Sequence, residues 1–261
     1  MNYKWNYVPA SNEQQEESRE LANELGISPI LGKILLDRNI RSVSEAKRFF
    51  RPQLSDLHDP FLYTDMDVAV DRLNQALGHK ERILVYGDYD VDGCTAVALV
   101  YKFIQQYYSN IDYYIPDRYT EGYGVSTQGI DYAAEQGCKL VITLDCGIKA
   151  VEKVAYANSK GIDVIVCDHH TPGDTLPDAV AVLNMKRSDC PYPYKDLSGC
   201  GVGSKLAQAY TQRYLIEAKG NEAIRLSGER LLPLTQLLAM SIASDIVPIT
   251  GENRILAHFG I

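Results

Sequence analysis

The chain has 261 residues, a net charge of −8 and an apolar content of 46%. This length allows one large domain or two small ones, and the composition is ordinary for a globular protein in water. The sequence contains no apolar run of about 18 residues, which excludes a membrane-spanning helix. The acidic balance argues mildly against a dedicated nucleic-acid-binding protein, which usually carries a basic stripe.

The cysteines and the first residues indicate the compartment. Six cysteines form no C-x-x-C pair, and several lie in apolar runs that resemble strands. They are therefore predicted to be buried reduced thiols rather than a zinc site or a disulfide framework. Residues 1–5 lack the apolar core of a signal peptide. Together these features predict a cytoplasmic protein.

Residues 1–80 are predicted to form a helical segment. Helices are expected over 11–25, 28–38, 42–51 and 65–77. Gly26 is a typical helix stop, and the Ser28–Pro29 pair is typical of a helix start. No residue of this segment is predicted to carry chemistry.

Residues 81–261 show an alternation of strands and helices. Strands are expected over 82–86, 111–115, 139–144, 163–167 and 179–183, and helices fill the intervals between them. This rhythm predicts an α/β domain in which a mostly parallel sheet is covered by helices on both faces.

Three aspartates follow the first of these strands, in the segment ILVYGDYDVDG at 83–93. Asp88, Asp90 and Asp92 would repel one another without a cation, and a divalent metal is the simplest remedy. An EF-hand loop is excluded, because its twelfth position would be Leu99 instead of glutamate. An aspartyl-phosphate phosphatase and a solvated acidic turn remain as alternatives.

Two further strands end in residues that bind metals. Asp145 follows the strand at 139–144, and the sequence DHH at 168–170 follows the strand at 163–167. Asp145 could instead cap the next helix. Since adjacent histidines point in different directions, at most one of His169 and His170 is expected to bind the same metal as the aspartates.

A fourth carboxylate and two further stretches complete the candidates. Asp245 follows a nearly apolar helix, where a metal or a buried Arg254 could be its partner. The glycine-rich segment 198–205 includes Gly201 and Gly203, whose N–H groups could bind an anion. Arg118 at a strand end could bind phosphate, or it could form a surface ion pair with Glu121.

These motifs, in this order and spacing, resemble the DHH phosphoesterase superfamily. Within it, the D-Y-D-V-D-G form of the first motif resembles the RecJ branch of single-strand-specific 5′→3′ exonucleases. Further similarity lies in the segments at 57–61, 118–124, 190–193 and 199–203. Such enzymes continue into a DHH-associated domain and an OB-fold domain, and neither can be fitted to this chain. The sequence is therefore expected to be the N-terminal part of such an enzyme.

The resemblance implies a metal-dependent phosphodiesterase with two divalent cations, Mn²⁺ or Mg²⁺. Asp90 with Asp88 would hold one ion, and Asp92, His169 and Asp245 would hold the other, with Asp145 as the bridge. His170, Arg118 and Arg254 would bind phosphate, and Asp168 would orient a metal ligand.

The implied substrate is single-stranded DNA in repair and recombination. The implied partners are single-strand-binding or recombination proteins. Two alternatives share parts of this prediction. One is a DHH-family enzyme that cleaves nano-RNA, cyclic dinucleotides or pyrophosphate. The other is a scaffold that binds nucleic acid without catalysis.

Overall fold

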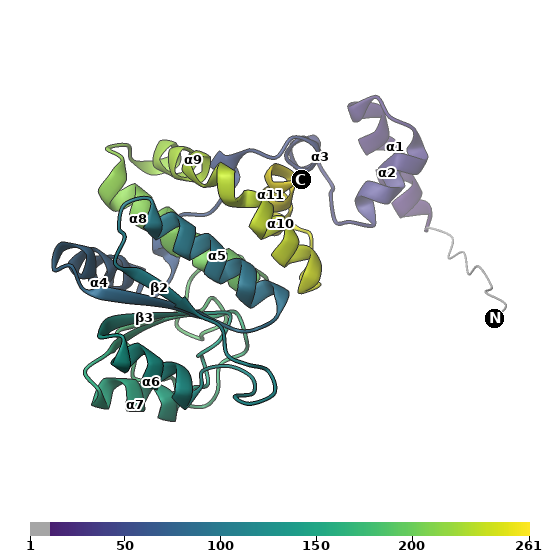
Figure 1. Cartoon of the computed structure of the whole chain (residues 1–261). Helices are drawn as coiled ribbons and strands as arrows, with labels where there is room; N and C mark the ends of the chain where they lie inside the picture. The colour runs from purple at the N-terminus through teal and green to yellow at the C-terminus, as the bar shows by residue number, and fades with distance from the viewer. Residues whose placement is uncertain (1–10) are drawn as a thin grey trace. The chain divides into compact units, whose positions relative to one another are not determined.

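The computed structural model describes residues 11–261. The expectation about a signal peptide therefore lies outside the described residues. Two compact units divide the chain, one ending at Gln53 and the other beginning at Leu54 (Figure 1). Among the helices of the described residues, none is long and apolar enough to cross a membrane.

The first unit contains three short helices, α1 (Asn12–Leu25), α2 (Pro29–Leu36) and α3 (Val43–Phe50). Ser11 and Ser42 each close a capping box, which satisfies backbone N–H groups that the first helical turn leaves free. The apolar faces meet in a small core. Its buried members are Leu21, Leu35, Leu36, Ile40 and Ala46.

A parallel five-stranded sheet forms the centre of the second unit. Its strands are β1 (Arg82–Gly87), β2 (Ile111–Tyr114), β3 (Cys138–Leu144), β4 (Asp163–Cys167) and β5 (Ala181–Leu183). The spatial order is β2-β1-β3-β4-β5. The predicted α/β class is confirmed, because strands and helices alternate and the strands are parallel. The inner strands β1, β3 and β4 are buried along most of their length, whereas the edge strand β2 is partly exposed.

Helices cover both faces of the sheet, as Figure 1 shows. On one face, α6 (Thr127–Glu135) and α7 (Val151–Ser159) pack against alternate strand residues such as Leu84 and Val141. On the other face, α4 (Met66–Gly78), α5 (Val91–Gln105) and α8 (Gly199–Tyr210) pack against the intervening residues, such as Ile83 and Ile142. The period of two along each strand therefore separates two apolar cores.

The C-terminal helices pack on the second of these cores. They are α9 (Gly220–Leu231), α10 (Thr235–Ser244) and α11 (Gly251–Gly260). Helix α10 contacts both α5 and α8, so its C-terminal end lies near the residues that follow β1. The sequence pattern placed the helix at 65–77, which is α4, in the helical segment 1–80. In the structure α4 belongs to the larger unit, because buried Met66, Val70 and Leu73 join the core of the sheet.

Candidate metal centre

The candidate residues lie at the carboxyl ends of the strands, where the strand order reverses. From β1 the chain moves outward to β2 and then returns to β3 on the other side of β1. In open α/β sheets, ligands bind outside the strand ends at such a reversal. Here the segment after β1 carries Asp88, Asp90 and Asp92, and the residue after β3 is Asp145.

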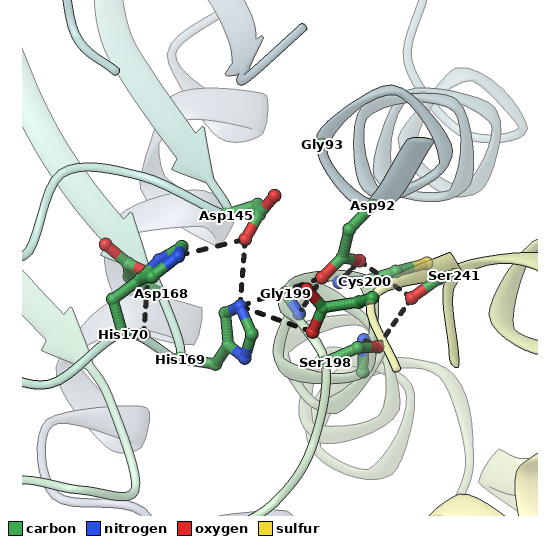
Figure 2. A network of polar contacts seen from close by, with 12 residues as sticks. Asp92, Gly93, Asp145, Asp168, His169, His170, Ser198, Gly199, Cys200 and Ser241 are labelled. Atoms are coloured by element: carbon green, nitrogen blue, oxygen red, sulfur yellow. Dashed lines mark hydrogen bonds and ion pairs between the residues drawn. The ribbon is translucent and has the colours of Figure 1, made fainter. Parts of the chain in front are cut away.

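Asp92 is a buried carboxylate with a full set of hydrogen bonds (Figure 2). The backbone N–H groups of Gly199 and Cys200 donate to its two oxygens over 2.6 and 2.8 Å, and the Ser241 hydroxyl donates over 2.7 Å. Since Ser241 gives its proton to Asp92, the Ser198 hydroxyl donates to Ser241 Oγ, 2.6 Å away. Helices α8 and α10 thus stabilise Asp92 as an anion.

The Asp145 side chain is also buried, but among the described residues its carboxylate lacks the hydrogen bonds that Asp92 accepts. Its exposed fraction is 2%, and its Oδ1 atom makes no hydrogen bond to any described residue. Burial, together with the charges of Asp92 and Asp90, raises the pKa of Asp145 to about 10. A cation beside this oxygen would reverse the shift, because an adjacent positive charge favours the carboxylate.

The backbone at Asp145 is as unusual as its side chain. Its φ of 58° is left-handed, and α7 begins at Val151 with Ala150 at the N-cap. The alternative in which Asp145 caps that helix is therefore wrong. A Cβ atom on Gly199 would lie 2.5 Å from the Asp145 Cβ atom, so only glycine lets α8 approach so closely.

Asp88 and Asp90 flank the other side of Asp145. One oxygen of buried Asp88 accepts the Gly124 N–H over 3.3 Å, whereas Oδ2 has no hydrogen-bond partner in the described part of the chain. Burial raises the pKa of Asp88, and hydrogen bonds from Gly124 and Tyr89 oppose that rise. Asp90 is the N-cap of α5 and accepts the Gly93 N–H over 2.9 Å.

His169 lies between the carboxylates (Figure 2). Its Nε2 atom is 3.1 Å from Asp145 Oδ1, 3.7 Å from Asp245 Oδ2 and 3.8 Å from Asp92 Oδ2. Within the described chain this buried nitrogen makes no hydrogen bond. Asp245 is the C-cap residue of α10, and burial raises its pKa.

Three groups of side chains place their ligand atoms within 4.8 Å of one another. They are Asp88 with Asp90 and Asp145, Asp92 with His169 and Asp245, and Asp145 with His169 and His170. Asp145 and His169 each belong to two groups. Asp88, Asp145 and His169 each contribute to these groups a side chain with a buried atom that makes no hydrogen bond in the described chain, namely Asp88 Oδ2, Asp145 Oδ1 and His169 Nε2. Carboxylate oxygens with one imidazole are a donor set that suits Mn²⁺ or Mg²⁺, so the residues fit divalent ions.

Asp168 holds His170 at the edge of the centre. Its Oδ1 atom accepts the His170 Nδ1–H over 2.8 Å and the His170 backbone N–H over 3.1 Å, and its Oδ2 atom accepts the Ile148 N–H over 2.9 Å. Burial opposes ionisation of Asp168, but these donors outweigh it and lower its pKa. The hydrogen bond to Asp168 in turn raises the pKa of His170.

The remaining predicted residues lie outside the three groups. The Arg118 guanidinium lies 5.3 Å above the Tyr89 ring. The Glu121 carboxylate accepts hydrogen bonds from Tyr114, Asp117 and Ser126 instead. Among the described residues Arg118 forms no ion pair with Glu121, so that alternative is wrong. Arg254 lies in α11 and is half-buried.

Gly201 and Gly203 lie inside α8 rather than in a loop before it, and both are buried. The Gly201 N–H donates to Ser198 Oγ over 3.1 Å. A Cβ atom on Gly203 would come within 2.9 Å of Leu144, so this glycine allows close packing. The structure does not bring these two glycines to the metal-ligand groups. The nearby N–H groups that bind an anion are those of Gly199 and Cys200, and the anion is Asp92.

Two contributors to the site were missed by sequence reasoning. Ser241 donates to Asp92 across 149 positions of sequence, and no local signal identifies it. The Tyr123 hydroxyl lies 3.1 Å from His170 Nε2. A signal for Tyr123 was present, because it lies between Gly122 and Gly124 in a strand-end segment with two positive φ angles.

Comparison with known proteins places these residues in a family. A model of the DHH family, N-terminal domain, matches residues 82–231. The single-stranded-DNA-specific exonuclease RecJ of Bacillus subtilis is 37% identical over 247 residues, which is 95% of this chain and 29% of that protein. The RecJ exonuclease of Escherichia coli is 36% identical over 248 residues, 94% of this chain and 42% of that protein.

Solved structures of RecJ exonucleases also match this chain. A crystal structure of exonuclease RecJ bound to manganese matches 76% of this chain and 47% of its own, with a TM-score of 0.65 and 30% identity. RecJ from Thermus thermophilus in complex with Mn²⁺ matches 94% of this chain and 33% of its own, with a TM-score of 0.74 and 26% identity. The chain thus spans less than half the length of these relatives.

Proposed function

The chain belongs to the DHH family, and on that premise we propose that it is the catalytic part of a metal-dependent exonuclease that degrades single-stranded DNA from the 5′ end. One observation carries the proposal. Asp145 and His169 link the three groups of candidate metal ligands, since each belongs to two of them, and the groups lie where the strand order reverses.

Two divalent cations, Mn²⁺ or Mg²⁺, are the proposed cofactors. Asp88 and Asp90 would hold one ion, and Asp92, His169 and Asp245 would hold the other. Asp145 would contribute to both ions, because it groups with Asp88 and Asp90 and also with His169. Bound ions of this kind polarise a phosphoryl group and lower the pKa of an attacking water. The hydrogen bonds to Asp92 fix its side chain, which would orient it as a ligand.

The other residues of the centre bind and orient the substrate in this proposal. Asp168 accepts the His170 Nδ1–H, so a protonated His170 has a second N–H at Nε2 to donate to a phosphate oxygen. Nε2 faces the Tyr123 hydroxyl in the structure. Arg118 would hold a second phosphate, because a guanidinium suits that geometry. Arg254 stays a prediction of the same kind.

The proposed substrate and cellular role are inferred from the matching exonucleases. Single-stranded DNA is the proposed substrate because the matching exonucleases are named for it. A role in DNA repair and recombination, cytoplasmic location, and contacts with single-strand-binding or recombination proteins belong to the same proposal.

Hydrolysis of 5′-phosphorylated single-stranded DNA in Mn²⁺ tests the function. The controls are EDTA, a duplex of the same sequence and a dinucleotide. A thermal melt with and without Mn²⁺ runs in parallel, because an ion that binds only the folded state stabilises it by about 2.7 kcal/mol at 100 times its Kd. We expect Mn²⁺-dependent release of nucleotides from the single strand and a higher Tm.

The outcomes separate the site from the substrate. A higher Tm with cleavage of the dinucleotide alone would favour a phosphodiesterase of short nucleotides. Strand binding with no hydrolysis in any metal would favour a scaffold. An unchanged Tm without cleavage would contradict the metal centre itself.

A further inference from the structure

A cavity of about 270 Å³ opens beside His170, between the Tyr123 segment and the start of α7. Asp168 and His170 form the wall that it shares with the metal centre. Val125 and Ile148 give the cavity an apolar part. None of the residues on the α7 side of the cavity has a role in the proposed function.

Two lysines line the cavity on that side. Lys149 is exposed, and no hydrogen bond or ion pair joins it to any described residue. Lys153 is half-buried, and its ammonium donates to the uncharged Thr127 hydroxyl over 2.7 Å. Across the described chain, no carboxylate lies within ion-pair distance of Lys153.

Other lysines in the same unit form ion pairs, which Lys149 and Lys153 do not form with any residue that the structure describes. Lys160, at the far end of α7, forms an ion pair of 2.9 Å with Asp131. The buried Lys205 forms one of 2.6 Å with Glu252. A half-buried ammonium is normally paired, because removing a charge from water is unfavourable. The cavity therefore brings together cations whose counter-ion is not part of the described chain.

The charges around the cavity favour an anion from outside. The single carboxylate in the wall, that of Asp168, already accepts three N–H groups from Ile148 and His170. Lys153 also lies in the first turn of α7, where the helix dipole disfavours a cation unless an anion is near. A phosphate at the two ammonium groups would relieve both effects.

We propose that this cavity holds the nucleotide next to the scissile phosphate, with its backbone phosphate against Lys149 and Lys153. The inference rests on the proposed function, because His170 belongs to both the metal-ligand groups and the cavity wall. A strand that places one phosphate at His170 thus meets the two lysines with a neighbouring phosphate. Val125 and Ile148 would contact the sugar or the base.

Strand binding without metal tests the cavity separately from hydrolysis. The probe is hexathymidylate with a 3′ fluorophore, and anisotropy in EDTA gives its Kd over a series of salt concentrations. The test variants are the double variant Lys149→Ala/Lys153→Ala and the single variant Lys149→Ala, which removes no contact within the described chain. The matched control is Lys139→Ala, because Lys139 is an exposed lysine at the opposite end of β3.

We expect the double variant to bind the strand about tenfold more weakly than the Lys139→Ala control. The slope of log K against log salt should become shallower by about 0.7, the value for one lost phosphate contact on a single strand. In Mn²⁺, the KM for the strand should rise while kcat stays near that of the control. Hydrolysis of bis(p-nitrophenyl) phosphate should not change, because this compound has no neighbouring phosphate.

Equal Kd and equal salt slope for the double variant and the control would overturn the cavity assignment, as would failure of the wild-type chain to bind the strand at low salt. Failure of the proposed function looks different. The wild-type chain would then bind the strand and hydrolyse nothing in Mn²⁺, and weaker binding by the double variant would still support the cavity.

Discussion

Asp92 and Asp145 lie on two sides of the proposed metal centre and differ in the hydrogen bonds that their carboxylates accept. Both side chains are almost fully buried. Asp92 accepts hydrogen bonds from Gly199, Cys200 and Ser241. One oxygen of Asp145 accepts no hydrogen bond within the described chain, although His169 Nε2 lies 3.1 Å from it, and burial raises the pKa of Asp145 to about 10.

This difference indicates which side depends on a cation. A buried carboxylate with three donors is stable as an anion in the metal-free protein. A buried carboxylate without donors is destabilising when charged and is relieved only by protonation or by a positive ion. The Asp92 side of the proposed centre is thus preformed by the fold, and we expect a cation to complete the Asp145 side.

The largest expected effect is on hydrolysis. In Asp145→Asn, cleavage of single-stranded DNA in Mn²⁺ should fall by roughly 10³-fold or more, which is about 4 kcal/mol of transition-state stabilisation. The reason is that Asp145 belongs to two of the ligand groups. Initial rates at saturating strand give the measurement, and Asp131→Asn, an aspartate of α6 that pairs with Lys160, is the control. Turnover near that of the control would rule out Asp145 as a shared ligand.

In EDTA, substitution of the two aspartates should change the free energy of unfolding differently. Asp92→Asn should lower the free energy of unfolding by about 2–3 kcal/mol, because an amide cannot accept all the hydrogen bonds that a carboxylate does. Asp145→Asn should leave that free energy unchanged or raise it, since it removes a buried carboxyl group that has to bind a proton on folding. Urea unfolding of both variants gives the comparison. An equal loss of unfolding free energy in both variants would mean that the protein stabilises the two carboxylates to the same extent.

The sequence predicted the strand-end residues better than it predicted their partners. Asp88, Asp90 and Asp92 follow an apolar run, and burial of that run brings them to the edge of the sheet. The partners of Asp92 come from helices that lie more than a hundred positions away in the sequence. Local patterns carry no information about such contacts, so Ser241 could not be identified.

The glycine-rich segment 198–205 also shows that the sequence does not reveal which distant groups come into contact. Its glycines suggested that the N–H groups of Gly201 and Gly203 bind an anion, whereas the structure gives this role to the N–H groups of Gly199 and Cys200. The sequence could not show that the helix begins at Gly199 and that the anion is the protein's own Asp92. Likewise, the position of Asp145 was predicted from the strand before it, but the sequence did not predict its left-handed backbone or the close approach of Gly199 in α8.

A smaller effect should appear in the pH dependence of the metal-free protein. The pKa of Asp145 is raised from 3.8 to about 10 in the folded state. Between these values the folded chain binds a proton that the unfolded chain has lost, so the free energy of unfolding falls as pH rises. Asp168 acts in the opposite sense, because its lowered pKa gives stability that is lost as pH falls through the folded value.

Urea midpoints in EDTA between about pH 5 and about pH 9 measure this dependence. The midpoint of the wild-type chain should fall across the range, and the fall should be smaller in Asp145→Asn. Saturating Mn²⁺ should flatten the wild-type curve, because the ion favours the ionised carboxylate. Equal slopes for wild type and variant would show that the Asp145 carboxyl group is not the source.

The smallest expected effect comes from Ser241, the side-chain donor to Asp92. Ser241→Ala leaves the N–H groups of Gly199 and Cys200 in place, so the free energy of unfolding in EDTA should fall by only about 1 kcal/mol. Mn²⁺ affinity should weaken by roughly tenfold, as expected when a group that orients a ligand is lost. Ser244→Ala is the matched control, because Ser244 is an exposed serine of α10 that bonds to the Met240 carbonyl. If both serine variants bind Mn²⁺ equally, the backbone of α8 alone suffices to hold Asp92, and the Asp92 side is preformed by one helix rather than by two.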